Sequence, residues 1–179
     1  MARALVIVDF QNDFTPGGAL AVSDGDAIAG RVNELARSGD YDLVVATRDW
    51  HPPDHGSFAA QGGPWPPHCV QGTPGAELHP ALDQARVDVV VDKGQDPATE
   101  GYSGFEATNL AELLRERDVD HVTVVGLATD YCVMNTALDA LRNGFGVTVD
   151  SNAVRAVELE PGDGERALEA VRAAGGSIA

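Results

Sequence analysis

The chain has 179 residues and a mass of 18.7 kDa, which fits a single domain covering residues 1–179. Its 28 acidic and 12 basic side chains give a formal net charge of −16, and a field of this sign repels phosphate backbones and anionic lipids, so we expect no nucleic-acid and no membrane partner. No apolar run is long enough to span a membrane and two cysteines are too few for a disulfide framework, so the sequence predicts a soluble cytoplasmic protein with free thiols.

Short apolar runs rich in β-branched residues alternate along the chain with segments of helical periodicity. In chain order, the predicted elements are a strand at Ala4–Val8, a helix through Ile28, Val32, Leu35 and Ala36, strands at Leu43–Ala46 and Val87–Val91, a helix at Leu110–Leu114, a strand at Val122–Val125, a helix at Tyr131–Asn143, a strand at Val147–Val149, a helix at Glu165–Ala174 and a sixth strand at the C-terminus. Ser23 or Asp24 is available to cap the first helix.

This alternation predicts an α/β fold with three layers, α/β/α, and a mostly parallel, Rossmann-like central sheet of about six strands. In such a sheet, ligands bind beyond the carboxyl ends of the strands. Asp9, Arg48-Asp49, Lys93 and the segment Gly126–Cys132 all follow predicted strand ends. We therefore expect these residues to lie at one edge of the sheet, where a functional site would form.

The segment from about residue 48 to residue 86 interrupts the alternation, and we call it the irregular segment. It shows no helical or strand period, yet it holds seven of the ten prolines and four of the five histidines. A connection of this length inside a compact domain is usually either functional or disordered. The aromatic residues Trp50, Phe58 and Trp65 favour burial and argue against disorder. Some other interaction should hold the segment in place.

A metal ion would supply that interaction through the series Asp49, His51, His55 and His68. In an extended chain Asp49 and His51 point the same way, and the two prolines after His51 prevent it from pairing with His55 across a helical turn. One carboxylate and three imidazoles suit Zn²⁺, Fe²⁺ or Mn²⁺ better than Ca²⁺. The same pattern also fits ordinary loop histidines, so spacing alone leaves both interpretations open.

Three residues at predicted strand ends have the chemistry of a catalytic site. Cys132 lies at a strand-to-helix turn, where unpaired N–H groups and the helix dipole lower a thiol pKa and can hold an oxyanion. Lys93 is the only lysine among twelve basic residues. Asp9 closes the first strand. Taken singly, each has an ordinary alternative: a buried thiol, a solvent-facing lysine and a turn aspartate.

Several motifs, in the same order over nearly the whole chain, resemble the nicotinamidase/pyrazinamidase branch of the isochorismatase-like cysteine hydrolases. They are Val8–Phe14, Thr47–His51, Trp65–Val70, Lys93-Gly94, Tyr102–Phe105 and Gly126–Val133. The resemblance implies an amidohydrolase that converts nicotinamide, and also pyrazinamide, to the carboxylate and ammonia through a Cys132 thioester. It implies a role in NAD salvage and is compatible with a homo-oligomer.

The resemblance also implies the roles of individual residues. Asp9, Lys93 and Cys132 would form the catalytic triad, and the backbone N–H groups of Ala128 and Cys132 the oxyanion hole. One divalent metal, zinc before iron or manganese, would be bound by Asp49, His51, His55 and His68. The substrate ring would contact Phe14, Trp65, Tyr102 and Leu127. The peptide bond Leu127–Ala128 would be cis, and Tyr131 stands where relatives often have histidine.

Three other functions remain open at this level. The first is a metal-independent relative that acts on another small amide, a carbamoyl compound or a vinyl ether. The second is a metal-binding or metal-sensing domain in which Cys132 is inert. The third is a phosphotransfer receiver built on Asp9 and Asp13, which would leave Cys132 and the histidines without a role.

Overall fold

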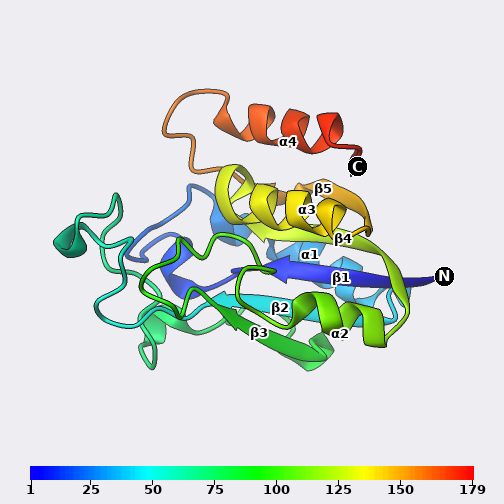
Figure 1. Cartoon of the computed structure of the whole chain (residues 1–179), viewed down its shortest axis with the longest axis horizontal. Coiled ribbons are helices and arrows are strands. Elements are labelled where there is room, and N and C mark those ends of the chain that lie inside the picture. The colour runs from blue at the N-terminus through cyan, green and yellow to red at the C-terminus, as the bar shows by residue number, and fades with distance from the viewer.

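The computed structural model describes residues 1–179 and contains one six-stranded sheet in which every neighbouring pair is parallel. The strand order is β3-β2-β1-β4-β5-β6, with β1 at Ala2–Val8, β2 at Leu43–Asp49, β3 at Val89–Lys93, β4 at Val119–Leu127, β5 at Gly146–Arg155 and β6 at Ser177–Ile178. The α-helices are α1 at Ala29–Arg37, α2 at Leu110–Glu116, α3 at Met134–Arg142 and α4 at Asp163–Ala173. The predicted three-layer α/β/α fold is confirmed (Figure 1).

The central strand β1 shows why the sheet needs a layer on each face. Ala4–Val8 is completely buried, and successive side chains point to opposite faces. Ala4, Val6 and Val8 pack in one core with residues of α2, α3 and α4, whereas Leu5 and Ile7 pack in a second core with residues of α1 and of the irregular segment. A strand buried on both faces therefore appears in the sequence as a continuous apolar run.

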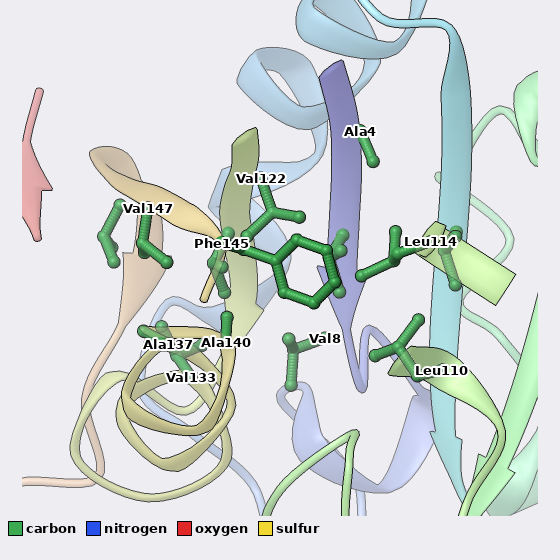
Figure 2. Close-up of a cluster of buried hydrophobic side chains, with 14 of the residues drawn as sticks. Ala4, Val8, Leu110, Leu114, Val122, Val133, Ala137, Ala140, Phe145 and Val147 are labelled. Carbon is green, nitrogen blue, oxygen red and sulfur yellow. The ribbon is translucent and has the colours of Figure 1, made fainter. Parts of the chain in front are cut away.

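The first of these cores is the larger. Figure 2 shows the ring of Phe145 among Val8, Leu114 and Val122, with α3 close by. Burying a side chain of this size stabilises the fold by about 1.5–3 kcal/mol. Packing on this face thus fixes α2 and α3 against the strands whose carboxyl ends carry the predicted functional residues.

The structure corrects several predicted boundaries. β5 continues to Arg155, six residues past its predicted end. Thr129–Val133 forms a π-helical turn, so α3 begins at Met134 and not at Tyr131. Neither Ser23 nor Asp24 caps α1, because a 3₁₀ turn at Gly25–Ile28 leads directly into that helix. Local periodicity does not reveal such turns.

The irregular segment folds at the carboxyl ends of β1 and β2, on the left of Figure 1. It contains three 3₁₀ turns, and isolated bridges pair His51 with Val70 and Phe58 with Trp65. A further bridge joins it to Gln11, just after β1. The segment is therefore ordered and lies over the edge of the sheet where the site was expected. No helix in the chain has the length and apolar character needed to cross a membrane.

Candidate active site

The carboxyl edge of the sheet brings Asp9, Lys93 and Cys132 together. Lys93 ends β3, Asp9 follows β1, and Cys132 lies in the π turn after β4. The Nζ atom of Lys93 is 2.8 Å from Oδ2 of Asp9 and 3.6 Å from Sγ of Cys132. All three residues are buried. The spatial arrangement that the resemblance implied is therefore present.

Asp9 is fixed by its neighbour on β2. The hydroxyl of Thr47 donates a hydrogen bond of 2.8 Å to Oδ1 of Asp9, and the backbone N–H of Asp9 donates to the carbonyl of Thr47 at 3.1 Å. Asp9 has a φ of 47°, a left-handed conformation that aspartate tolerates better than most residues. This conformation takes the chain out of the sheet and leaves the carboxylate at the sheet edge.

Lys93 is a buried cation shared by two carboxylates. Besides Asp9, its Nζ atom contacts Oδ1 of Asp49 at 2.5 Å and the carbonyl of Gly101 at 2.7 Å. Burial alone would lower the pKa of Lys93, but Asp49 and Asp9 outweigh it and hold that pKa well above its ordinary value. Lys93 therefore stays charged.

The two carboxylates respond differently to the same burial. Burial raises the pKa of Asp9 to about 6, although Lys93 acts in the opposite direction. Burial also acts to raise the pKa of Asp49, but Lys93 and His51 reverse the effect and the pKa lies below its usual range. Asp9 can therefore take up and release a proton near neutral pH, and Asp49 stays ionised.

The thiol of Cys132 does not have the low pKa that its place before a helix suggested. Burial raises its pKa well above the ordinary value, and although Lys93 lowers it, Asp9 adds to the increase. The expectation of a lowered pKa is therefore wrong. A neutral thiol next to a carboxylate of pKa about 6 needs that carboxylate to remove its proton when it attacks.

The predicted metal-binding side chains also meet. Nε2 of His51 lies 3.2 Å, and Nε2 of His68 3.8 Å, from Oδ2 of Asp49, and donor atoms of the three residues lie within 4.8 Å of one another. The ring of His55 is 3.9 Å from that of His51, centroid to centroid. Nε2 of His55 is buried and has no hydrogen-bond partner. Leaving such an atom unpaired is costly, so the site is suited to a cation.

The opposite nitrogen of each histidine ring is held by the surrounding chain. Nδ1 of His51 contacts the carbonyl of Gly94 at 2.7 Å, and Nδ1 of His68 contacts the carbonyl of Pro66 at 2.8 Å. Nδ1 of His55 is 2.7 Å from the hydroxyl of Ser57. Contacts of this kind orient the ring and leave Nε2 free for a metal. The donor set therefore fits a divalent transition metal.

Gln11 holds Asp49 from the β1 side, a role that sequence reasoning missed. Its side-chain oxygen accepts the N–H of Asp49 at 2.9 Å, and its side-chain nitrogen donates to the carbonyls of Asp49 and Ala76, each at 2.8 Å. Because the chain leaves the sheet at Asp9, the Gln11 amide replaces the strand partner that Asp49 would otherwise lack. The only sequence signal is a glutamine three residues after the end of β1.

The Cys132 thiol lies in the lining of a cavity with about 380 Å³ of empty space, part of it open to solvent. Of the predicted substrate-binding residues, Phe14, Trp65 and Tyr102 line this cavity, whereas Leu127 is fully buried in the core and does not. Ala128, after a cis peptide bond to Leu127, lines it too. Tyr131, which the resemblance placed at the rim of the pocket, is also a lining residue, and the lining residues that sequence reasoning did not assign to the pocket are Leu20, Val22 and Val157.

The aromatic residues of this cavity contact one another. The Trp65 indole N–H donates to the Tyr102 hydroxyl at 3.1 Å, and the Tyr131 ring stands edge-on to the Trp65 ring at 5.2 Å. Asp49 and His68 also belong to the lining, so the histidine cluster and Cys132 share one cavity. The arrangement suits a small, flat ring held between aromatic side chains with a reactive group directed at Cys132.

A parallel α/β sheet with a buried Cys–Lys–Asp cluster and an adjacent histidine cluster is thus the architecture of this chain. Residues 3–179 match the family model of the isochorismatase domain, and the chain belongs to the isochorismatase family.

Several of its relatives match over almost the full length of the chain. A nicotinamidase of Escherichia coli is 42% identical over 200 residues, which span 98% of this chain and 93% of the relative. Pyrazinamidase of Pyrococcus horikoshii, solved in complex with zinc, is 49% identical with a TM-score of 0.92, covering 100% of this chain and 99% of that one. PnC1 of L. infantum, solved in complex with nicotinate, is 38% identical with a TM-score of 0.94, and the match covers 99% of this chain and 92% of that one.

Proposed function

We propose that this chain is a metal-containing, cysteine-dependent amidase that hydrolyses nicotinamide, and also pyrazinamide, to the carboxylate and ammonia. The observation that carries the proposal is the convergence of Asp9, Lys93 and Cys132 at a cavity that is lined by aromatic residues and shared with a histidine cluster. The named activities of full-length relatives give the substrate: a nicotinamidase, a pyrazinamidase and a protein solved with nicotinate.

The first half of the reaction forms an acyl-enzyme. Asp9 takes the proton of the Cys132 thiol, and the thiolate attacks the carboxamide carbon while Lys93 balances the charge. The backbone N–H groups of Ala128 and Cys132 hold the developing oxyanion. Asp9 then gives its proton to the departing amine, the C–N bond breaks, and ammonia leaves a thioester on Cys132.

The second half hydrolyses the thioester. Asp9, again ionised, removes a proton from a water molecule that attacks the thioester carbon, and Cys132 departs as a thiolate and regains the proton from Asp9. The product leaves as the carboxylic acid and loses its proton to solvent or to the ammonia released earlier, which gives nicotinate. A carboxyl group with a pKa of about 6 is suited to both roles, because it accepts and returns a proton at modest cost near neutral pH.

Asp49, His51, His55 and His68 would hold the metal, within the segment of about residues 48–86 that we propose as its binding loop. Zinc fits one carboxylate and three imidazoles well, and it is present in the P. horikoshii relative; iron and manganese are the alternatives. When bound, the ion supplies Lewis acidity toward a ligand in the shared cavity. Phe14, Trp65 and Tyr102 would hold the ring of the substrate.

The product would feed pyridine nucleotide biosynthesis in NAD salvage. A cytoplasmic location and a homo-oligomeric assembly stay predictions, as does the description of residues 1–179 as one domain.

Ammonia release from nicotinamide by metal-replete protein tests the proposed function. We expect turnover by the native chain and a loss of more than about a thousandfold for Cys132→Ala, because the nucleophile is gone. Cys69→Ala is the matched control, since Cys69 is the other buried thiol and is not assigned a step.

Metal analysis of the same proteins completes this test. Cys132→Ala should keep the metal content of the native chain, because the proposed ligands are intact. Substantial amidase activity in Cys132→Ala would refute the assignment of the nucleophile. If the metal-replete native chain releases no ammonia, nicotinamide is not its substrate and the proposed function is refuted.

A further inference from the structure

Asp130 connects the turn that carries Cys132 with a distant segment of the chain. It lies two residues before Cys132, and only 9% of its surface is exposed. Its two carboxylate oxygens are used separately: Oδ1 accepts the backbone N–H of Val157 and Oδ2 that of Glu158, each at 2.9 Å. Hydrogen bonds to a buried carboxylate are stronger than those between neutral groups.

The segment that Asp130 holds forms part of the cavity wall. Val157, between the end of β5 and the start of α4, is one of the lining residues of the cavity that contains Cys132. Without a side-chain contact to hold it, Val157 would move whenever the segment between β5 and α4 moved. The two bonds from Asp130 tie this wall directly to the nucleophile turn.

Glu158 anchors the other end of the same segment. Its φ is 57°, and its carboxylate accepts the N–H of Gly162 at 2.7 Å and the N–H of Gly164 at 2.8 Å, at the start of α4. The segment is thus held between the π turn on one side and the first turn of α4 on the other. Asp130 is the link that sets its distance from Cys132.

The proposed reaction does not use the Asp130 carboxylate. Both of its oxygens accept main-chain N–H groups, and the acid–base role is assigned to Asp9. Asp130 does not cap a helix either, since no side chain caps the π turn or α3. What remains is its effect on the position of Val157.

Resting on the proposed function, we propose that Asp130 is a positioning residue that fixes the Val157 wall relative to Cys132 and so determines which substituted aromatic amides the cavity accepts. With the wall held in place, the cavity favours an unsubstituted ring. With the wall released, it admits extra atoms on the ring at the expense of nicotinamide binding. A change of one methyl group in an apolar pocket changes kcat/KM by roughly 10–200-fold.

The test uses Asp130→Asn, which keeps the size of the side chain but replaces one acceptor with an NH₂ group that faces an N–H donor. We expect the KM for nicotinamide to rise about tenfold while kcat falls less than about threefold. In a panel of singly ring-methylated nicotinamides, at least one should gain in kcat/KM relative to nicotinamide. Val157→Ala should produce the same change in preference with the nucleophile turn intact.

The controls separate positioning from general damage. Asp139→Asn, at a half-buried residue of α3 that pairs with Arg142 and does not line the cavity, should leave KM and substrate preference unchanged. Asp130→Glu keeps both acceptor oxygens and should recover at least half of the loss in KM. Equal losses of kcat/KM for every amide in Asp130→Asn, or unchanged kinetics, would overturn the proposal.

Amide hydrogen exchange gives a result that does not depend on activity. In Asp130→Asn, exchange at Val157 and Glu158 should accelerate at least about tenfold, while exchange in β1 stays as in the native chain. Native protection at both amides in this variant would contradict the proposal. If the native chain releases no ammonia from nicotinamide, the proposed function fails, whereas the exchange result still decides whether Asp130 holds the segment. If Asp130→Asn does not fold, Val157→Ala decides: an unchanged substrate preference in Val157→Ala would refute the role of the Val157 wall on which the proposal depends.

Discussion

Lys93 links the two halves of the site. Its ammonium contacts the carboxylates of Asp9 and Asp49, and it lies 3.6 Å from the sulfur of Cys132. One buried cation therefore compensates a group in the proposed acid–base role and a group in the proposed metal-ligand role. Removing one partner from such a cluster leaves an uncompensated buried charge, so the lysine is needed for stability as well as for the proposed chemistry.

Protonation of Asp9 should determine how kcat/KM for nicotinamide depends on pH. Because its pKa is raised from 3.8 to about 6, native Asp9 becomes protonated as the pH falls through about 6 and can no longer accept the Cys132 proton. We expect kcat/KM for nicotinamide to fall about tenfold per pH unit below that value. The same shift means that ionising Asp9 opposes folding, so its contribution to the free energy of unfolding decreases as the pH rises from about 4 to about 6.

Steady-state kinetics between pH 4.5 and 8, with metal content measured at each pH, checks this expectation. If metal is lost over the range in which activity falls, the acid limb belongs to the histidines instead of Asp9. A rate that stays constant down to pH 4.5 with full metal content would contradict the role of Asp9 as the base.

At the scale of elements, the irregular segment packs around the histidine cluster. Few of its residues are in regular structure, yet His51, His55 and Phe58 are buried within it. A ligand that binds only the folded state stabilises it, by about 2.7 kcal/mol when present at one hundred times its Kd. The buried, unpaired Nε2 of His55 is where that stabilisation would originate.

Removal of the metal should therefore lower the thermal midpoint. We expect a chelator to reduce Tm and to expose the irregular segment to limited proteolysis, and added Zn²⁺ to restore both. In His55→Ala, the difference in Tm between protein with chelator and protein with added Zn²⁺ should be much smaller. His121→Ala, a change to a half-buried histidine outside the segment, should keep the full difference. Identical melting with and without chelator would count against a metal in this cluster.

At the scale of the whole molecule, the net charge of −16 affects the stability of the folded state. Like charges on the folded surface repel, and added salt screens them, since the Debye length falls from about 10 Å at 0.1 M to about 3 Å at 1 M. We expect Tm to rise as sodium chloride increases from 50 mM to 1 M. An equal osmolality of a neutral solute is the control, and a Tm that falls with salt would show that buried ion pairs outweigh surface repulsion.

The sequence predicted the fold well where local pattern and burial coincide. The strand at Ala4–Val8 was found because both of its faces are covered, and the helix at Glu165–Ala174 because one face is apolar. The strand end at Arg155 and the π turn at Thr129–Val133 were missed. Their conformations follow from packing between segments that are far apart in sequence, which periodicity does not record.

By itself, the sequence determined the layered α/β fold, the order of its elements and, through the resemblance, the residues that meet at the sheet edge. Only the tertiary structure decided the protonation of Asp9 and Cys132, because burial and the shared cation Lys93 set their pKa values. It alone also assigned Gln11 to hold Asp49 and Val157 to the cavity wall. The order of the elements and the chemistry of each side chain can be read directly from the sequence. The electrostatic environment of a group and the lining of a cavity depend on residues that are distant in sequence and meet only on folding.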